Sequence, residues 1–211
     1  MPGFFITIEG IEGAGKSSIA ERLDEWLQKK GLQTFRTREP GGTIVGEKLR
    51  EIILNAERPL TVQAELLLIE AARAQLMEEV ILPQLADDKS VILDRHCDSS
   101  TAYQGYGRGV DAQLISTINR FACQNRIPDL SILLDIDVMT GLSRARTVKE
   151  KEDFKDRFES EAVEFMQKVR DGFLEIARQE PNRVIKISAQ TELDMVWSGV
   201  QNAVSDRLFS R

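Results

Sequence analysis

The sequence predicts an α/β fold in which a five-stranded parallel sheet is flanked by helices. Short apolar runs alternate with longer stretches of helical periodicity, and most of these runs are continuously apolar. Continuous apolar strands are buried on both faces, as in a parallel sheet covered by helices. With 211 residues and 42% hydrophobic content, the chain can bury roughly 70% of its unfolded surface. We therefore expect a single domain over residues 1–211.

The strands are expected at the short apolar runs. These are FFITIE (4–9), QTFRT (33–37), SVILD (90–94), LSILLDI (130–136) and RVIKI (183–187). The stretches around them have helical periodicity and predict helices at about 16–30, 43–55, 61–84, 111–124, 138–146, 157–179 and 191–209. This alternation is typical of βαβ units. The composition changes abruptly at TVKEKEDFKDR (147–157), a short connector between two predicted helices that contains four basic and four acidic residues.

Charge and cysteine content exclude several classes of partner. The net charge is -6 and no long basic block occurs, so we expect no nucleic-acid partner, whereas a small anionic ligand stays possible. Cys97 and Cys123 form no C-x-x-C pair, and we expect that His96 does not complete a metal set with them. Two free thiols suit a reducing compartment.

The N-terminal stretch and the hydropathy predict no membrane association. MPGFFITIEG has no basic region followed by a long apolar one, and no run approaches the roughly 18 apolar residues that span a bilayer. We expect a soluble, cytoplasmic protein.

The stretch IEGIEGAGKSS, residues 8–18, predicts a phosphate-binding loop. It fits the pattern G-x-x-x-x-G-K-S and lies between an apolar strand and a predicted helix, as the motif requires. Glycines let backbone amides turn toward phosphate oxygens, Lys16 neutralises the outer phosphates, and the Ser17 hydroxyl can ligate magnesium. We expect a P-loop NTPase fold that binds its nucleotide through Gly10, Glu12, Gly13, Ala14, Gly15, Lys16, Ser17 and Ser18.

The remaining sequence limits the class of P-loop protein. A GTPase would need an N-K-x-D motif that reads the base, and no Asn-Lys pair is present. An ATP-driven switch is harder to exclude from the loop alone, so it stays open as a function without group transfer.

The third strand ends in Asp94 and Arg95, at the edge where ligands and magnesium are held in such folds. Polar side chains crowd the next turns, which favours a second ligand there. If this ligand is itself a phosphate, its second ionisation near pKa 6 leaves it largely deprotonated at pH 7. No general base is then required, and His96 can be idle in the reaction.

Several motifs together resemble bacterial thymidylate kinases. They are IEGIEGAGKSS (8–18), TREPGGT (37–43), EKLR (47–50), EAARAQ (70–75), DRHCDSSTAYQGYGRG (94–109), PDLSILLD (128–135) and DRFE (156–159). The similarity covers about residues 4–187. It implies transfer of the γ-phosphate of ATP to dTMP with Mg²⁺, giving dTDP for dTTP synthesis, usually by a homodimer. Another nucleotide or deoxynucleoside kinase remains the alternative enzyme.

The resemblance also implies a role for individual residues. Lys16 and Ser17 contact the ATP phosphates and magnesium, Asp94 organises magnesium-bound water, and Arg95 bridges the acceptor phosphate to the transferred group. Glu12 faces the acceptor sugar, and an aromatic ring is usual at the position of Ile69. The residues expected at the acceptor are Glu12, Glu39, Pro40, Arg50, Ile69, Arg73, Arg95, Ser100, Tyr103 and Gln104. Alternatives are an exposed Glu12, a surface Arg50, and an Ile69 that belongs to the helix core.

A mobile lid is expected at about 144–157. In the family that the sequence resembles, an arginine comes either from the phosphate loop or from the lid. The loop has Gly13 at the relevant position, so the lid must supply the cation. We expect Arg146 or Lys149 in this role, with Arg144 and Arg157 as further candidates. The alternative is that the lysines here form a solvated face.

Overall fold

The computed structural model describes residues 3–149 and 163–209. Five strands form one parallel sheet in the order β2-β3-β1-β4-β5. They are β1 (Phe5–Glu9), β2 (Thr34–Arg38), β3 (Ser90–Asp94), β4 (Leu130–Asp135) and β5 (Val184–Ser188). Each predicted strand is present, with ends within one residue of those expected. The predicted α/β class with a five-stranded parallel sheet is confirmed.

Helices fill the connections between the strands. The α-helices are α1 (Lys16–Lys29), α2 (Ile44–Leu54), α3 (Val62–Leu76), α4 (Leu82–Ala86), α5 (Cys97–Ser100), α6 (Ala112–Ala122), α7 (Val138–Lys149), α8 (Val163–Gln179) and α9 (Leu193–Val204). Wider π-turns η1 (Met77–Ile81), η2 (Thr101–Gly107) and η4 (Ser205–Phe209) extend α3, α5 and α9. Side-chain caps start four of the described helices, because Thr43, Thr61, Asp111 and Asp137 accept from the backbone N–H three residues later.

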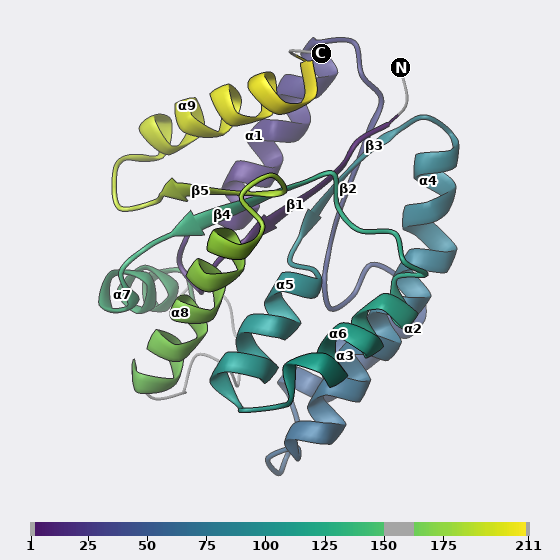
Figure 1. Ribbon diagram of the computed structural model, residues 1–211, viewed down its shortest axis with the longest axis vertical. Helices are drawn as coiled ribbons and strands as arrows, with labels where there is room; N and C mark the ends of the chain where they lie inside the picture. Colours follow the sequence, from purple (N-terminus) through teal and green to yellow (C-terminus); the bar gives the residue numbers. More distant parts are fainter. Residues whose placement is uncertain (1–2, 150–162, 210–211) are drawn as a thin grey trace.

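The helices cover the sheet on both faces. Helices α1 and α9 pack together on one face, while α4, α5 and α8 pack on the opposite face (Figure 1). Right-handed crossovers produce this division, because the chain moves one way from β1 to β2 and the other way in each later crossover. The central strands β1, β3 and β4 are almost wholly buried, and the edge strands β2 and β5 are partly exposed.

The segment α5–η2 was not predicted from the sequence. It is polar and contains Gly105 and Gly107, so its helical periodicity is weak. Packing against α8 stabilises it, since a Cβ at Gly107 would lie 2.7 Å from the Phe165 ring. Tyr103 makes edge contacts with Phe165 and Phe173, with ring centroids 6.2 Å apart in both cases. Tertiary contacts therefore outweigh weak local propensity in this segment.

Within residues 3–149 and 163–209, no helix combines the length and apolar character that a membrane span needs.

Candidate active site

The predicted site lies at the carboxyl edge of the sheet. Asp94 at the end of β3 is paired with Ile8 of β1 and with Arg38 of β2. The phosphate loop follows β1 directly, and Glu39 follows β2 directly. Three segments that are distant in sequence therefore meet at one edge, where open parallel sheets bind ligands.

The phosphate loop, residues 10–15, has a conformation that requires glycine. Gly13 has φ 73°, and a Cβ there would lie 2.0 Å from the carbonyl oxygen of Gly141 in α7. Gly15 precedes α1, and no side chain caps this helix. The first N–H groups of α1 can therefore bind an anion at the loop. Lys16 Nζ donates to the Ile11 carbonyl oxygen at 2.9 Å, and burial lowers the pKa of Lys16 to about 8.

Ser17 and Asp94 lie together at the start of α1. The Ser17 hydroxyl donates a 2.8 Å hydrogen bond to Asp94 Oδ2. Hydroxyl and carboxylate oxygens are hard ligands, and Mg²⁺ usually combines one or two of them with phosphate oxygens and water. The donor set at this position therefore fits a magnesium ion bound to nucleotide phosphates.

Arg95 joins the phosphate loop to η2. Its Nη2 lies 2.6 Å from Glu12 Oε1, and its guanidinium lies over the Tyr103 ring, 5.0 Å from the centroid. The Tyr103 hydroxyl also contacts Glu12, at 2.7 Å. Burial favours a protonated Glu12, but Arg95 and Lys16 outweigh it and lower the pKa of Glu12. Arg95 has φ 68°, a left-handed conformation that costs a non-glycine residue about 1–3 kcal/mol and is common at functional sites.

Arg73 is fully buried and fixed by protein groups. Its Nε and Nη2 lie 2.8 and 2.7 Å from Glu39 Oε2. Its Nη1 contacts Glu70, donates to Ser100 Oγ at 3.0 Å and donates to Asn119 Oδ1 at 2.8 Å. A guanidinium has five N–H donors, so this set leaves one N–H of Nη2 for a ligand.

One cleft brings these groups together. Arg50 is fixed at its rim, where Nη1 donates to the Pro40 carbonyl oxygen at 3.0 Å. Gln104 donates to Glu65 at 2.9 Å, while its buried Oε1 has no partner among the described residues. Such an orphan acceptor in a cleft wall suits an N–H donor on a ligand. The cleft is lined by Glu12, Glu39, Pro40, Arg50, Leu54, Ile69, Arg73, Arg95, His96, Ser99, Ser100, Tyr103 and Gln104.

Every residue that was expected at the acceptor lines this cleft. Glu12 is not an exposed side chain, and Ile69 contributes to the cleft wall. Beside the cleft lies a phosphate loop with the geometry of a nucleotide site. The arrangement therefore suits two ligands, one in the cleft and one whose phosphates the loop would bind.

Comparison with known proteins agrees with this geometry. Residues 8–199 match the family model described as thymidylate kinase. The chain belongs to the thymidylate kinase family. It is 44% identical over 210 residues to a curated thymidylate kinase from Trichlorobacter lovleyi, covering 97% of this chain and 98% of that relative. The crystal structure of a thymidylate kinase from Ehrlichia chaffeensis is similar with a TM-score of 0.78 and 32% identity, covering 97% and 99% of the two chains. The family and the fold predicted from the sequence are thereby confirmed.

Four residues of this thymidylate kinase site were not assigned to the acceptor from the sequence, although Ser99 belongs to the polar turns noted after Arg95. Leu54, His96 and Ser99 line the cleft, and Asn119 reaches Arg73 from α6. Leu54 and Asn119 lie in periodic helices where nothing distinguishes them from neighbours. His96 and Ser99 stand inside the DRHCDSS motif, so their proximity to Arg95 was the available signal.

The lid residues lie mostly outside what the structure describes. Arg144 is an exception, since it donates to the Ala189 carbonyl oxygen at 2.9 Å. Arg146 and Lys149 belong to α7, which runs three residues beyond its predicted end, but their side chains are not among the described groups. Lys151 and Arg157 lie outside the described residues.

Proposed function

We propose that this chain transfers the γ-phosphate of ATP to dTMP, giving dTDP for dTTP synthesis. The carrying observation is the Glu12–Arg95 ion pair of 2.6 Å, because it joins the phosphate loop to the acceptor cleft. A phosphoryl group held by Lys16 would thus lie next to an acceptor phosphate held by Arg95. Phosphoryl transfer needs mainly positioning and neutralisation of charge, which this arrangement supplies.

We propose that Ser17 and Asp94 hold the magnesium ion of the nucleotide. Their oxygen atoms lie 2.8 Å apart beside Lys16. A bound Mg²⁺ would bridge phosphate oxygens and neutralise their charge. Lys16 would exchange its bond with the Ile11 carbonyl oxygen for one with a phosphate oxygen.

The cleft supports thymine as the acceptor base. The orphan Oε1 of Gln104 can accept from the N3–H of thymine, and the remaining N–H of Arg73 can donate to a base carbonyl oxygen. Ile69 supplies an apolar surface for the base. Tyr103, fixed by Glu12, crowds the sugar, which favours deoxyribose.

The catalytic cation remains a proposal from the sequence. We propose Arg146 or Lys149, because the phosphate loop has Gly13, and no arginine, at the relevant position. Neutralising the essential residue should lower kcat with little change in the affinity for dTMP.

We further propose a cytoplasmic homodimer. Helices α2, α3 and α6 lie side by side (Figure 1), and each exposes large apolar side chains. Phe121 of α6 is 85% exposed and Ile44 at the start of α2 is 81% exposed. A second copy that covers this face would remove these side chains from water. Analytical ultracentrifugation of the chain and of Phe121→Glu tests this, because the variant should shift toward monomer.

A coupled assay of ADP release tests the function. The acceptors are dTMP, dUMP, AMP, CMP and thymidine, each with and without Mg²⁺. We expect preferential, magnesium-dependent turnover of dTMP. Preference for another acceptor would support another nucleotide or nucleoside kinase, and ATP binding without ADP release would support a switch protein.

A further inference from the structure

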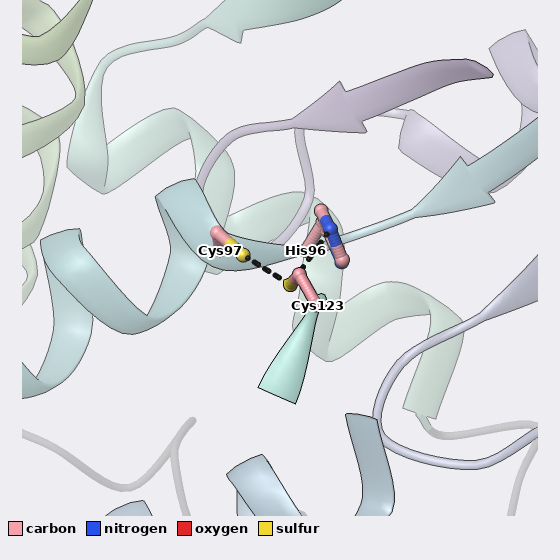
Figure 2. A group of neighbouring side chains, drawn as sticks. All are labelled: His96, Cys97 and Cys123. Atoms are coloured by element: carbon pink, nitrogen blue, oxygen red, sulfur yellow. Dashed lines mark hydrogen bonds between the residues drawn. The ribbon is translucent and has the colours of Figure 1, made fainter. Parts of the chain in front are cut away.

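Three potential metal ligands converge behind the cleft. His96 follows β3, Cys97 opens α5, and Cys123 ends α6. Figure 2 shows their side chains pointing toward one another, and their ligand atoms all lie within 4.8 Å. The three side chains are therefore close enough to form a ligand set, which their sequence spacing did not indicate. Sequence spacing alone does not predict this proximity, because it arises only when the fold brings the end of α6 next to the start of α5.

The distances fit a tetrahedral zinc ion. Bonds of about 2.3 Å to sulfur and about 2.0–2.1 Å to nitrogen place sulfur and nitrogen about 3.5 Å apart and two sulfurs about 3.8 Å apart. Cys123 Sγ and His96 Nε2 are 3.5 Å apart. The two Sγ atoms are 3.1 Å apart. The sulfurs would have to separate by about 0.7 Å. The third pair, Cys97 Sγ and the His96 nitrogen, lies within 4.8 Å.

His96 has the partner that a metal-binding histidine requires. Its Nδ1 lies 2.9 Å from Glu39 Oε1, while Nε2 faces Cys123. A carboxylate that accepts from one ring nitrogen leaves the other nitrogen to bind a metal ion. Glu39 is in turn held by Arg73 at 2.7 Å, so the imidazole is oriented by a buried network.

The burial of His96 and Cys123 means that a metal ion would reach the three ligands from the side of Cys97. His96 and Cys123 are each 1% exposed, whereas Cys97 is half-buried. An ion would enter beside Cys97, and water can supply the fourth ligand from that side. Thiolate and imidazole donors select a soft or borderline ion over Mg²⁺, which prefers oxygen.

We propose that His96, Cys97 and Cys123 form a binding site for one zinc ion, separate from the magnesium site at Ser17 and Asp94. The bound ion would tie the β3–α5 junction to the end of α6. It lies apart from the phosphate loop, since none of its ligands touches Lys16 or Ser17 in the described contacts, and it borders the acceptor cleft through His96.

Binding exchanges protons for the metal ion. Burial lowers the pKa of His96, but Cys97 and the Glu39 carboxylate more than offset this and raise it to about 10. A hydrogen bond with Cys123 and burial raise the pKa of Cys97. Because zinc binds thiolates and an unprotonated imidazole nitrogen, protons on these ligand atoms pass to the buffer when the ion binds. No electron is transferred.

The test uses the full chain, reduced with a phosphine and freed of metal by chelation. Zinc is titrated by calorimetry without nucleotide, and cobalt is added separately as a spectroscopic probe. We expect saturation at one ion per chain, loss of thiol reactivity, and thiolate-to-cobalt charge-transfer absorption. Absence of saturable zinc binding, or a cobalt spectrum without this absorption, overturns the proposal.

Variants locate the site. Cys97→Ser, at the half-buried position, should remove most of the charge-transfer absorption, whereas Asp94→Asn should leave zinc binding intact. Glu39→Gln should retain the absorption but weaken zinc binding by about 10–100-fold, as loss of a histidine partner does. Binding that survives Cys97→Ser but is lost in Asp94→Asn would place the ion at the phosphate site and overturn the proposal. If Cys97→Ser does not fold, the thiol and cobalt measurements on the unmodified chain decide.

Discussion

Glu12 and Arg95 are 83 residues apart in sequence, yet their side chains form an ion pair of 2.6 Å between the phosphate loop and the strand end of β3. The pair is mostly buried and is braced by the Tyr103 hydroxyl. Arg95 itself has a left-handed backbone conformation, with φ 68°, at the end of β3.

Arg95→Lys should therefore lower kcat at least about tenfold, or about 1.4 kcal/mol of transition-state stabilisation. Lysine keeps the charge but lacks the planar fork that binds a carboxylate and a phosphate together. Steady-state kinetics with dTMP and ATP measure this. Arg22→Lys, which alters an ion pair with Asp194 outside the cleft, is the control and should keep kcat. Equal kinetics in both variants would remove Arg95 from the transfer step.

Lys16→Ala should abolish turnover while the fold persists. Lys16 is the buried lysine at the start of α1, next to the phosphate loop, where we expect it to neutralise the outer phosphates. Kinetics and circular dichroism measure the two effects, with the exposed Lys29→Ala as control. Retention of more than about a tenth of kcat would mean a loss below about 1.4 kcal/mol, too little for this role.

Ile69→Phe should tighten dTMP binding more than ATP binding. An aromatic ring adds stacking on the base, a contribution of about 1–3 kcal/mol in other base-binding proteins, of which isoleucine already supplies part. Calorimetric titration with each nucleotide measures the difference. Met195→Phe, on an exposed position of α9, should change neither affinity. Equal effects of Ile69→Phe on both ligands would exclude Ile69 from the base site.

The raised pKa of the buried Glu9 carboxyl should make the stability of the fold depend on pH. Burial, aided by Asp98, raises the pKa of Glu9 to about 7 from an ordinary 4.5. The folded chain then binds a proton that the unfolded chain releases, so the stabilisation from this proton is complete below about pH 4.5 and is lost as pH rises through about 7.

Glu9→Gln should accordingly be less pH-sensitive than the unmodified chain. Relative to that chain, its unfolding free energy should improve between about pH 5 and 8 by roughly 2–4 kcal/mol. Urea denaturation across this range measures it, with the exposed Glu57→Gln as control. A constant difference between Glu9→Gln and the unmodified chain at all pH values would contradict the assignment.

Gly13→Ala should destabilise the fold more than Gly15→Ala. Both positions have positive φ, at 73° and 88°, so both substitutions carry backbone strain. Only the Cβ at Gly13 meets another backbone, that of Gly141, whereas the Cβ at Gly15 meets nothing within 4 Å. The overlap should add about 1–3 kcal/mol. Thermal and urea unfolding of the two variants measure this, and equal losses would mean that α7 moves aside freely.

Much of the fold could be predicted from the local pattern of apolar residues, and most residues of the candidate site could be predicted from sequence motifs. The strands were predictable because buried parallel strands are continuously apolar, as in LSILLDI. The α5–η2 segment was not, because Gly107 looks like a helix breaker until Phe165 is packed against it. Similarly, Asn119 meets Arg73 only when α6 lies beside α3, and Cys123 meets Cys97 only when the end of α6 lies beside α5. A single sequence carries no record of these contacts.

The sheet order has a consequence for the evolution and redesign of this chain. Apart from Glu12, every residue of the cleft comes from the stretch between Glu39 and Gln104. This stretch begins after β2 and includes β3, and these two strands are neighbours on one half of the sheet. Lys16 and Ser17 belong to the helix that follows the central strand β1. Recognition of the acceptor thus depends mainly on one contiguous stretch, which also carries Asp94 and Arg95. Exchanging that stretch between relatives, with Asp94 and Arg95 retained, should change which nucleotide is phosphorylated while Lys16 and Ser17 stay in place.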